Sequence, residues 1–401
     1  MTGWSFRVSV ICLCITGLLG CPAIEEPADD AGADSGSEGP RDAGASGDAA
    51  VSDDAGNTQV DLWRAVAGGT NHSCGVDAQG QVWCWGDNSS GQLGSASPSS
   101  SPSPVQVAGV GSAVAVSAGW AHSCAVNEAG EVWCWGWNDL GALGDGSTDE
   151  RTSPVRARDV SGAVDVACGD SHTCALTDSG AVWCWGFNEY GQLGDGSAPQ
   201  DKYTPVQVSA LRDATSVAAG FMHTCASSAD GKAWCWGSND YGEAGPNANP
   251  DGMEPNPVPL EVTGVGEVQR VTAGDAFGCA LTGQGAVWCW GENDSGQLGG
   301  GSGGGVPSQV SDLADVADLS AGSYHLCAVD SAGQVLCLGD NSSGQLGVDP
   351  GVTEGGPSPR QVGDLASASR VAAGDTHTCA ATIGAPGVWC WGAGEEGQLG
   401  G

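Results

Sequence analysis

The sequence predicts an all-β fold, a seven-bladed β-propeller with four-stranded blades. A segment of about 50 residues recurs seven times in the chain of 401 residues, and each copy carries two cysteines. Within a copy, short runs of β-branched and aromatic residues alternate with turns, and no long helical periodicity interrupts them. Four short strands per repeat of this length are typical of propellers, whose blades bury both faces against their neighbours.

The clearest element of each copy is a β-hairpin, as in residues 172–194, HTCALTDSGAVWCWGFNEYGQLG. In the first copy, two apolar runs flank the segment 78–80, which ends in glycine. Glycine adopts the positive φ that the last position of a three-residue hairpin loop usually requires. Counting outward from such a loop places Cys74 opposite Cys84. Opposed residues of neighbouring strands lie close enough for a disulfide.

The same count predicts one disulfide in every copy, because six cysteine pairs are ten residues apart and the seventh is eleven apart. The predicted bridges join Cys74 with Cys84, Cys124 with Cys134, Cys174 with Cys184, Cys225 with Cys235, Cys279 with Cys289, Cys327 with Cys337, and Cys379 with Cys390. Each bridge would stabilise the fold by roughly 2.5 to 3 kcal/mol by restricting the unfolded chain. Metal binding is the competing interpretation, but each copy lacks paired CxxC knuckles and offers at most three ligands. We therefore expect no metal and no cofactor.

Each hairpin is followed by a connection of variable length and then by a short strand that begins at a proline. These prolines are Pro104, Pro154, Pro205, Pro259, Pro307 and Pro359. From each proline to the next hairpin cysteine the count is always 20 residues, whereas from the preceding cysteine to the proline it runs from 18 to 24. Proline suits the start of a strand, where no ladder donor is lost. The variation in repeat length therefore lies in one connection per copy.

The longest of these connections, Pro246 to Pro259, is the candidate binding loop, because loops on a rigid scaffold carry specificity. Its candidate recognition residues are Asn247, Asn249, Asp251, Met253, Glu254 and Asn256. A tolerated insertion without function is the alternative interpretation of this segment.

The last copy lacks an outer strand of its own. The sequence stops at Gly401, directly after a GQLG segment, and no proline strand follows. Closure of the ring therefore requires residues from the amino-terminal side of the repeats, and we expect them near Thr58 to Val66.

The first residues are typical of an export signal. Arg7 precedes a twelve-residue apolar run, Val8 to Leu19, which is too short to span a bilayer and suits a signal-peptide core. The run ends in Leu18-Leu19-Gly20-Cys21, which resembles the lipobox of bacterial lipoproteins. We therefore predict a lipoprotein signal peptide over residues 1–20 and lipidation of Cys21. An ordinary signal peptide with an incidental cysteine is the alternative.

Residues 21–60 are expected to be a disordered acidic tether, which leaves residues 61–401 as the propeller. The tether has ten carboxylates, one arginine and almost no large apolar side chain, so it cannot bury enough surface to fold. Cysteine usage also supports export, because fourteen regularly spaced cysteines are hard to explain in a reducing cytoplasm. We expect a protein lipid-anchored to the cell envelope, at the periplasmic or surface face of the outer membrane. Cys168, outside the pairs, is expected to be a buried and inert thiol.

The repeat resembles that of a known family. GxVWCWGxNxxGQLG followed by VAAGxxHTCAL is similar to the repeat of the regulator of chromosome condensation 1 family, across residues 62–401. The chain departs from this pattern in its cysteine pairs, in Leu336-Cys337-Leu338, and in the segments 141–144 (GALG) and 242–245 (GEAG). The resemblance implies a seven-bladed propeller and does not settle activity.

The founding eukaryotic member of that family is a nucleotide-exchange factor that docks on chromatin, so the resemblance alone would imply such partners. Residues 61–401 carry 38 acidic and 10 basic side chains, which should repel nucleic acid. We therefore expect no nucleic-acid partner, and guanine-nucleotide exchange is the least favoured function.

Some members of the family use tryptophans in a GWRHT motif. Here only Gly119 to Ser123, GWAHS, approaches it. The positions equivalent to Trp120 in the other copies are Thr70, Asp170, Phe221, Asp275, Ser323 and Asp375. We therefore interpret the twelve tryptophans of the WCW segments as packing between blades.

No serine nucleophile elbow, HExxH motif or phosphate loop occurs, so we do not expect an enzyme. All six histidines lie two residues before a hairpin cysteine, and this repetition favours packing or hydrogen bonding over catalysis. The expected function is a monomeric protein-binding scaffold, which recognises its partner through the variable loops of one face and meets the membrane only through its lipid. A glycan-binding or glycan-active extracellular protein is the alternative, and carboxylates facing one pocket would favour it. A purely structural envelope protein is a third possibility.

Overall fold

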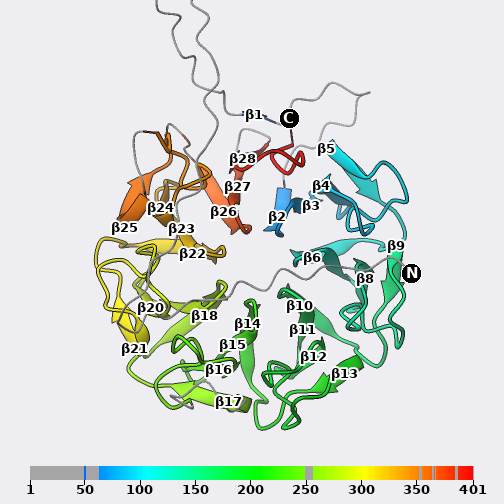
Figure 1. The fold of residues 1–401 in the computed structure, drawn as a ribbon, viewed down its shortest axis with the longest axis horizontal. Coiled ribbons are helices and arrows are strands. Elements are labelled where there is room, and N and C mark those ends of the chain that lie inside the picture. Colours follow the sequence, from blue (N-terminus) through cyan, green and yellow to red (C-terminus); the bar gives the residue numbers. More distant parts are fainter. Residues whose placement is uncertain are drawn as a thin grey trace, which may run out of the picture. The chain divides into compact units, whose positions relative to one another are not determined.

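Seven antiparallel sheets of four strands each are arranged around a common axis (Figure 1). The computed structural model describes residues 49–50, 63–248, 256–351, 355–363, 365, 367–383 and 387–400. They belong to one compact unit, Gly47–Gly401. The prediction of a seven-bladed propeller with four-stranded blades is confirmed. Among the described residues, no helix is long and apolar enough to cross a bilayer.

Each blade has an inner, a second, a third and an outer strand, counted from the axis. The inner strands are β2 (Trp63–Gly68), β6 (Ala113–Ala118), β10 (Ala163–Cys168), β14 (Ala214–Ala219), β18 (Val268–Ala273), β22 (Val316–Ala321) and β26 (Ala368–Ala373). The second strands are β3 (His72–Asp77), β7 (His122–Asn127), β11 (His172–Thr177), β15 (His223–Ser228), β19 (Phe277–Thr282), β23 (His325–Asp330) and β27 (His377–Thr382).

The third and outer strands complete the blades. The third strands are β4 (Val82–Asp87), β8 (Val132–Gly136), β12 (Val182–Gly186), β16 (Ala233–Gly237), β20 (Val287–Gly291), β24 (Val335–Asp340) and β28 (Val388–Gly392). The outer strands are β5 (Ser100–Val107), β9 (Arg151–Arg156), β13 (Lys202–Gln207), β17 (Asn256–Val262), β21 (Gly304–Gln309), β25 (Gly355–Gln361) and β1 (Ala49–Ala50).

The ring is closed by β1, which pairs antiparallel with β28 and so supplies the outer strand of the seventh blade. The prediction that residues near Thr58 to Val66 would do this was wrong in position. Val66 lies in β2, the inner strand of the first blade, and residues 58–62 lie outside the described part of the chain. The closing strand was missed because two alanines carry none of the β-branched or aromatic signal that marks a strand.

All seven predicted disulfides are present, each between the second and third strands of one blade. They join Cys74 to Cys84, Cys124 to Cys134, Cys174 to Cys184, Cys225 to Cys235, Cys279 to Cys289, Cys327 to Cys337, and Cys379 to Cys390. The Cα atoms are 4.1 Å apart in every pair, as in the closely spaced residue pairs of an antiparallel ladder.

The register of the hairpins is the predicted one. Cys174 lies directly opposite Cys184, and Cys379 lies opposite Cys390 although their spacing is one residue longer. The extra residue of the seventh copy therefore lies in the turn, where it does not disturb the pairing. Because the two sulfurs of each hairpin are joined in a disulfide, they are not free to bind a metal ion, which contradicts the alternative interpretation of the cysteine pairs as metal ligands.

The blades pack through the second tryptophan of each WCW segment. Trp185 and Trp236 are fully buried, and their indole Nε1 atoms donate to the carbonyl oxygens of Ala142 (2.7 Å) and Gln192 (2.8 Å) in the preceding blade. The first tryptophan of each pair is only partly buried. The interpretation of these residues as interblade packing therefore holds for the second position and only in part for the first.

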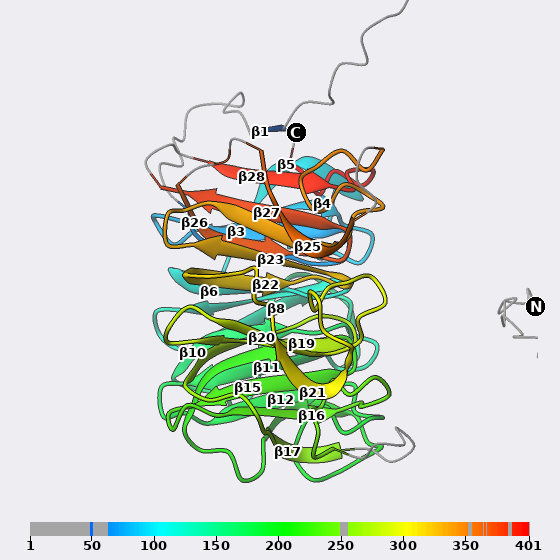
Figure 2. The same ribbon diagram turned by 90° about the vertical axis from the view of Figure 1, so that its left-hand side faces the viewer.

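The direction of the strands places the variable connections on one face. Each inner strand runs toward this face, the second strand returns from it, and the third strand leads back to it before the long connection begins. The start of that connection is hydrogen-bonded to the turn between the inner and second strands, as in Asp87 N donating to Asn71 O at 2.8 Å. In the side view of Figure 2 the strands run across the thickness of the ring, between its two faces. We call the face with these turns and connections the loop face.

Candidate functional site

A belt of hydrogen bonds joins neighbouring blades beneath the loop face. The Nε2 atom of His122 lies 2.9 Å from the hydroxyl oxygen of Thr173 in the next blade, and that hydroxyl donates to the carbonyl oxygen of Ala142 at 2.8 Å. Because the hydroxyl has a single hydrogen, the imidazole must be the donor from Nε2. The equivalent contact recurs between His72 and Ser123, His172 and Thr224, His325 and Thr378, and His377 and Ser73.

The six histidines are fully buried, and burial lowers their pKa values. The pKa falls to about 3 for His72, His172 and His325 and to about 4 for His122 and His377. Neutral imidazoles that donate to fixed hydroxyl groups hold blades together. This geometry agrees with the hydrogen-bonding role predicted from their repetition.

The belt is interrupted at the fifth blade. Phe277 stands where the other copies have histidine, and Gly278 stands where they have serine, threonine or, in copy six, leucine. Among the residues that the structure describes, no hydroxyl therefore faces His223 across the seam between blades four and five. Burial lowers the pKa of His223, while the nearby carboxyl of Glu243 opposes that shift.

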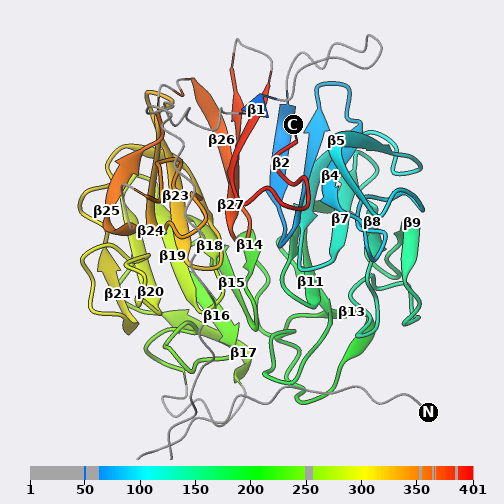
Figure 3. The same cartoon turned by 45° about the horizontal axis from the view of Figure 1, so that its top comes forward.

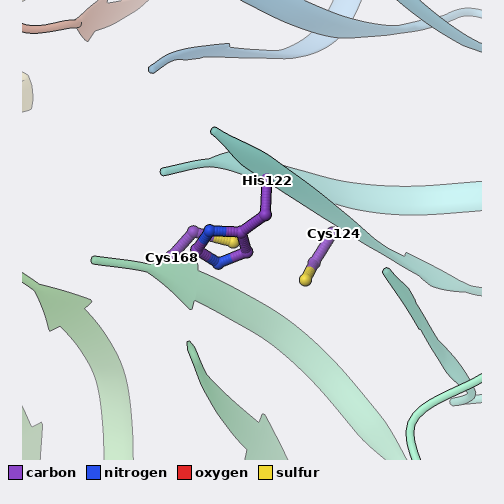
Figure 4. Close-up of side chains that lie close together, drawn as sticks. All are labelled: His122, Cys124 and Cys168. Carbon is purple, nitrogen blue, oxygen red and sulfur yellow. The ribbon is translucent and has the colours of Figure 1, made fainter. Parts of the chain in front are cut away.

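One cluster of metal-ligating side chains lies at the seam between β7 and β10 (Figure 4). Ligand atoms of His122, Cys124 and Cys168 all lie within 4.8 Å of one another, and all three residues are buried. The sulfur of Cys124 is bonded to that of Cys134, and burial raises the pKa of the Cys168 thiol to about 12. Neither sulfur is a ready thiolate, so the oxidised protein has no metal centre here. Cys168 is buried and is not in a disulfide, as expected.

At the loop face the central channel opens into a cavity of about 270 Å³, which we call the mouth. It is lined by the turns that join the inner and second strands of all seven blades. The middle residues of these three-residue turns, in ring order, are Thr70, Trp120, Asp170, Phe221, Asp275, Ser323 and Asp375. Figure 3, tilted from Figure 1, shows the inner strands converging around the axis. The sevenfold scaffold thus brings together residues about 50 positions apart in the sequence.

Aromatic and acidic side chains alternate from blade two to blade five of the mouth. Aspartates occupy blades three, five and seven, and aromatic residues occupy blades two and four. Tyr324, which follows Ser323 in the sequence, adds an aromatic ring in blade six. Trp120, Phe221 and Tyr324 expose 45%, 41% and 40% of their surface. Trp120 and Phe221 are therefore large apolar groups left in water at a concave site.

Glycine sets how tightly the turns pack around the mouth. A Cβ atom at Gly119 would overlap the carbonyl oxygen of Gly169 in the next blade and the imidazole of its own His122. The same overlap recurs at each equivalent glycine, with the ring of Phe277 in place of an imidazole at Gly274. Only a residue without a side chain allows the turns to approach so closely, and this fixes the spacing of the residues that follow.

The carboxylates of the mouth perturb one another. Burial raises the pKa of Asp275 to about 6, and repulsion by Asp375, Asp170 and Glu292 adds to this against an opposing hydrogen bond from Ser323. Burial and the charge of Asp375 also raise the pKa of Asp170. Among the described residues, no lysine or arginine forms an ion pair with these three aspartates. The mouth is therefore an uncompensated negative site.

The opposite end of the central channel carries both positive and negative side chains. Arg270 forms an ion pair with the buried Asp318, whose second oxygen accepts a hydrogen bond from Val371 N at 2.9 Å. Asp165 and Arg370 line the same opening. Positive and negative groups therefore lie together at this end of the channel, whereas the described residues that line the mouth include aspartates but no lysine or arginine.

The candidate binding loop is only partly described. Asn247 donates from Nδ2 to Glu261 O at 2.9 Å, and the buried Asn256 donates from Nδ2 to Gly237 O at 3.0 Å. Both amides therefore hold backbone at the base of the loop. Asn249, Asp251, Met253 and Glu254 lie outside the described residues, as do Cys21 and the predicted signal peptide.

The mouth was not predicted from the sequence. The residues that line it were compared only with a tryptophan motif, which Trp120 alone matches. Writing the seven residues in ring order would have shown the alternation of acidic and aromatic side chains. That signal depends on knowing that the ring closes, because Asp375 and Thr70 become neighbours only then.

The repeat is recognised by comparison with known proteins. One profile described as the regulator of chromosome condensation (RCC1) repeat matches residues 79–126, 129–176, 179–227, 230–281, 284–329 and 332–381. A second profile with the same description matches residues 63–92, 113–142, 163–192, 214–243, 268–297 and 316–345.

Two relatives illustrate the range of the similarity. The chain is 35% identical to the ultraviolet-B receptor UVR8 of Arabidopsis thaliana over 103 residues, which is 25% of this chain and 23% of the receptor. It is 35% identical to the regulator of chromosome condensation of Mus musculus over 92 residues, 23% of this chain and 21% of that protein. These alignments span about a quarter or less of either relative.

The crystal structure of human WBSCR16 superimposes with a TM-score of 0.69 at 25% identity, covering 82% of this chain and 86% of that one. The first repeat profile alone spans more than half of the sequence, and the folded ring agrees with it. The chain belongs to the regulator of chromosome condensation (RCC1) repeat family.

Proposed function

We propose that the protein is a lipid-anchored, extracytoplasmic protein-binding scaffold that holds its partner against the loop face. The observation that carries this proposal is the pair of half-exposed aromatic side chains, Trp120 and Phe221, that line one concave mouth, with the exposed Tyr324 next in sequence to the lining residue Ser323. Aromatic groups exposed at a concavity are typical of interaction sites. The long connections surround the same mouth and extend the surface that a partner would meet.

The location outside the cytoplasm is supported by the chemistry of the fold. Seven disulfides stay oxidised only where the redox environment permits. The apolar run before Cys21 gives a route for export, and lipidation of Cys21 gives an anchor. Metabolic labelling with a fatty acid tests the anchor, because the label should be incorporated into the full chain and be absent from the Cys21→Ser variant.

A rigid ring suits binding better than catalysis. The six histidines are buried and neutral, and five of them are hydrogen-bonded between blades, so none is available as a base at the surface. The belt, the disulfides and the interblade tryptophans fix the frame. What remains free to differ between blades is the mouth and the connections around it.

Capture of exported proteins tests the loop face as the binding surface. The compact unit Gly47–Gly401 is the fragment to immobilise, because a fragment that begins at Leu62 would lack the closing strand β1. A Trp120→Ser/Phe221→Ser variant should lose the captured partner. The matched control is Val114→Ser/Val164→Ser, which alters exposed apolar residues at the opposite ends of two inner strands. Equal capture by both variants would remove the loop face from consideration.

A glycan ligand is the second candidate function, and the mouth supplies a specific reason for it. Three carboxylates face one pocket beside exposed aromatic rings, and the pKa of Asp275 is raised to about 6. Sugars stack on aromatic faces, and paired carboxyl groups of unequal pKa are the usual machinery of glycoside hydrolysis. Release of reducing sugar from envelope polysaccharide by the wild type, abolished in Asp275→Asn, would favour this function over protein binding.

A further inference from the structure

The aromatic side chains of the mouth form an unpartnered surface. Trp120 packs edge-on against Trp137, with ring centroids 5.4 Å apart, so its ring is held in place while 45% of its surface stays exposed. Phe221 lies two blades further around the same mouth. Rings that are fixed and exposed in this way offer their faces to a ligand at little entropic cost.

The charge around these rings selects the ligand. Asp170 lies in the blade between those of Trp120 and Phe221, and Asp275 follows Phe221 in the next blade. Elsewhere on the loop face, Arg151 and Lys202 at the starts of β9 and β13 are already paired with aspartates. A positively charged group would therefore meet unpaired carboxylates and aromatic faces together, which is the environment that favours cation–π contact.

The spacing of the carboxylates argues against a bare metal ion. Among the described residues, the one group of three or more ligating side chains whose atoms lie within 4.8 Å of one another is His122, Cys124 and Cys168. The oxygens of Asp170, Asp275 and Asp375 are thus too widely spread to share one small ion. A guanidinium or ammonium group on a flexible stem can reach between them.

We propose that the mouth binds an arginine- or lysine-bearing segment of the partner protein, with the cation seated among Asp170, Asp275 and Asp375 and its stem against Trp120 or Phe221. This inference rests on the proposed function, since it names the chemistry of the partner that the loop face holds. Arginine is the better fit of the two cations, because its planar group stacks on aromatic rings and bonds two carboxylates at once.

Calorimetric titration with an acetylated tetra-arginine peptide tests the proposal on the full chain in detergent at physiological salt. The mouth variant Asp170→Asn/Asp275→Asn/Asp375→Asn should bind about tenfold more weakly than the wild type. The matched control, Asp178→Asn/Asp213→Asn/Asp312→Asn, removes the same formal charge from exposed residues beyond the opposite strand ends. It should stay within about twofold, because charges more than about 8 Å from the peptide are screened at this salt. Trp120→Ala should weaken binding several-fold without changing the charge.

Five outcomes would overturn the inference. Equal loss in the two triple variants would mean binding by net charge alone. An unaffected Trp120→Ala variant would remove the aromatic contribution. No binding by the wild type would exclude a cation site, and spermine binding as tightly as the peptide would indicate a small polyamine ligand. If exported proteins are still captured by the mouth variant, the cation site is rejected and the proposed protein-binding function is kept. If the peptide binds but no exported protein is captured, the protein-binding function is rejected and the cation site is kept.

Discussion

Two positions in each turn of the loop face, only two residues apart, behave in opposite ways. The histidine that ends the turn is present in six of the seven copies and is fully buried between blades. The residue two places before it changes from blade to blade, as in Trp120, Asp170 and Phe221, and it lines the mouth. In a repeat protein, a position that every blade needs maintains the ring. A position at which each blade differs is free to recognise something.

The largest expected effect is the loss of folding stability at acid pH, which tests the role of the buried histidines. The pKa of a buried histidine such as His172 is lowered to about 3 from its ordinary 6.5, so the unfolded chain takes up the proton first. The stabilisation is fully present above pH 6.5 and is lost as the pH falls toward 3. At pH 5 each such histidine should lower the free energy of unfolding by about 2 kcal/mol, and all six buried histidines act in this direction. Denaturant midpoints measured from pH 7.5 to 4.5 should fall steeply.

The mouth should respond to acid in the opposite sense. The pKa of Asp275 is raised, so protonation relieves repulsion in the folded ring as the pH falls through about 6. The six buried imidazoles outweigh this single carboxyl group, so stability should still fall as the pH falls. Midpoints that are flat or rising below pH 6.5 would show that the belt is not the structural element that its burial indicates.

Removal of one disulfide should have the next largest effect. Cys174→Ala/Cys184→Ala opens a bridge of ten-residue separation within a blade that keeps every other contact. The unfolded chain regains entropy, and the free energy of unfolding should fall by about 2.5 to 3 kcal/mol in equilibrium denaturation. Cys168→Ala is the control, because six other blades carry alanine or glycine at that position. A larger effect from the control than from the pair would contradict the structural role given to the bridges.

Features that depend on contacts within one repeat could be predicted from the sequence, whereas features that depend on the closed ring could not. The register of Cys74 and Cys84 followed from counting across one turn, and the seven blades followed from the repeat, because each depends on contacts within about 50 residues. The closing strand Ala49–Ala50 has no side-chain signal, and its place is set by the exposed edge of β28. The mouth depends on contacts between every blade and the next. Its members were visible in the sequence, but their order around one cavity was not.

Replacement of single histidines tests whether the hydrogen bonds of the belt contribute to the free energy of unfolding. His172→Phe removes a donor to Thr224 and should lower the free energy of unfolding by about 1 kcal/mol. His223→Phe removes a buried imidazole that no hydroxyl faces, so the change should be neutral or stabilising. Phenylalanine already occupies this position in the fifth blade, at Phe277, which is fully buried. Equal losses at both sites would show that the rings act through packing alone and that the hydrogen bonds of the belt contribute nothing measurable.

The smallest effect on stability is expected at the mouth, and its sign is informative. Asp275→Asn removes a carboxylate whose raised pKa marks it as unfavourable in the folded ring at neutral pH. The variant should be slightly more stable than the wild type at pH 7, by less than about 1 kcal/mol because the site is partly open to water. The difference should vanish near pH 4, where the native carboxyl is also protonated. A residue that is unfavourable for folding and unpaired with any basic residue is the kind that binding maintains. Thermal denaturation of Asp275→Asn beside Asp312→Asn, an exposed control, measures this directly, and a destabilised Asp275→Asn would place the mouth with the belt as part of the frame.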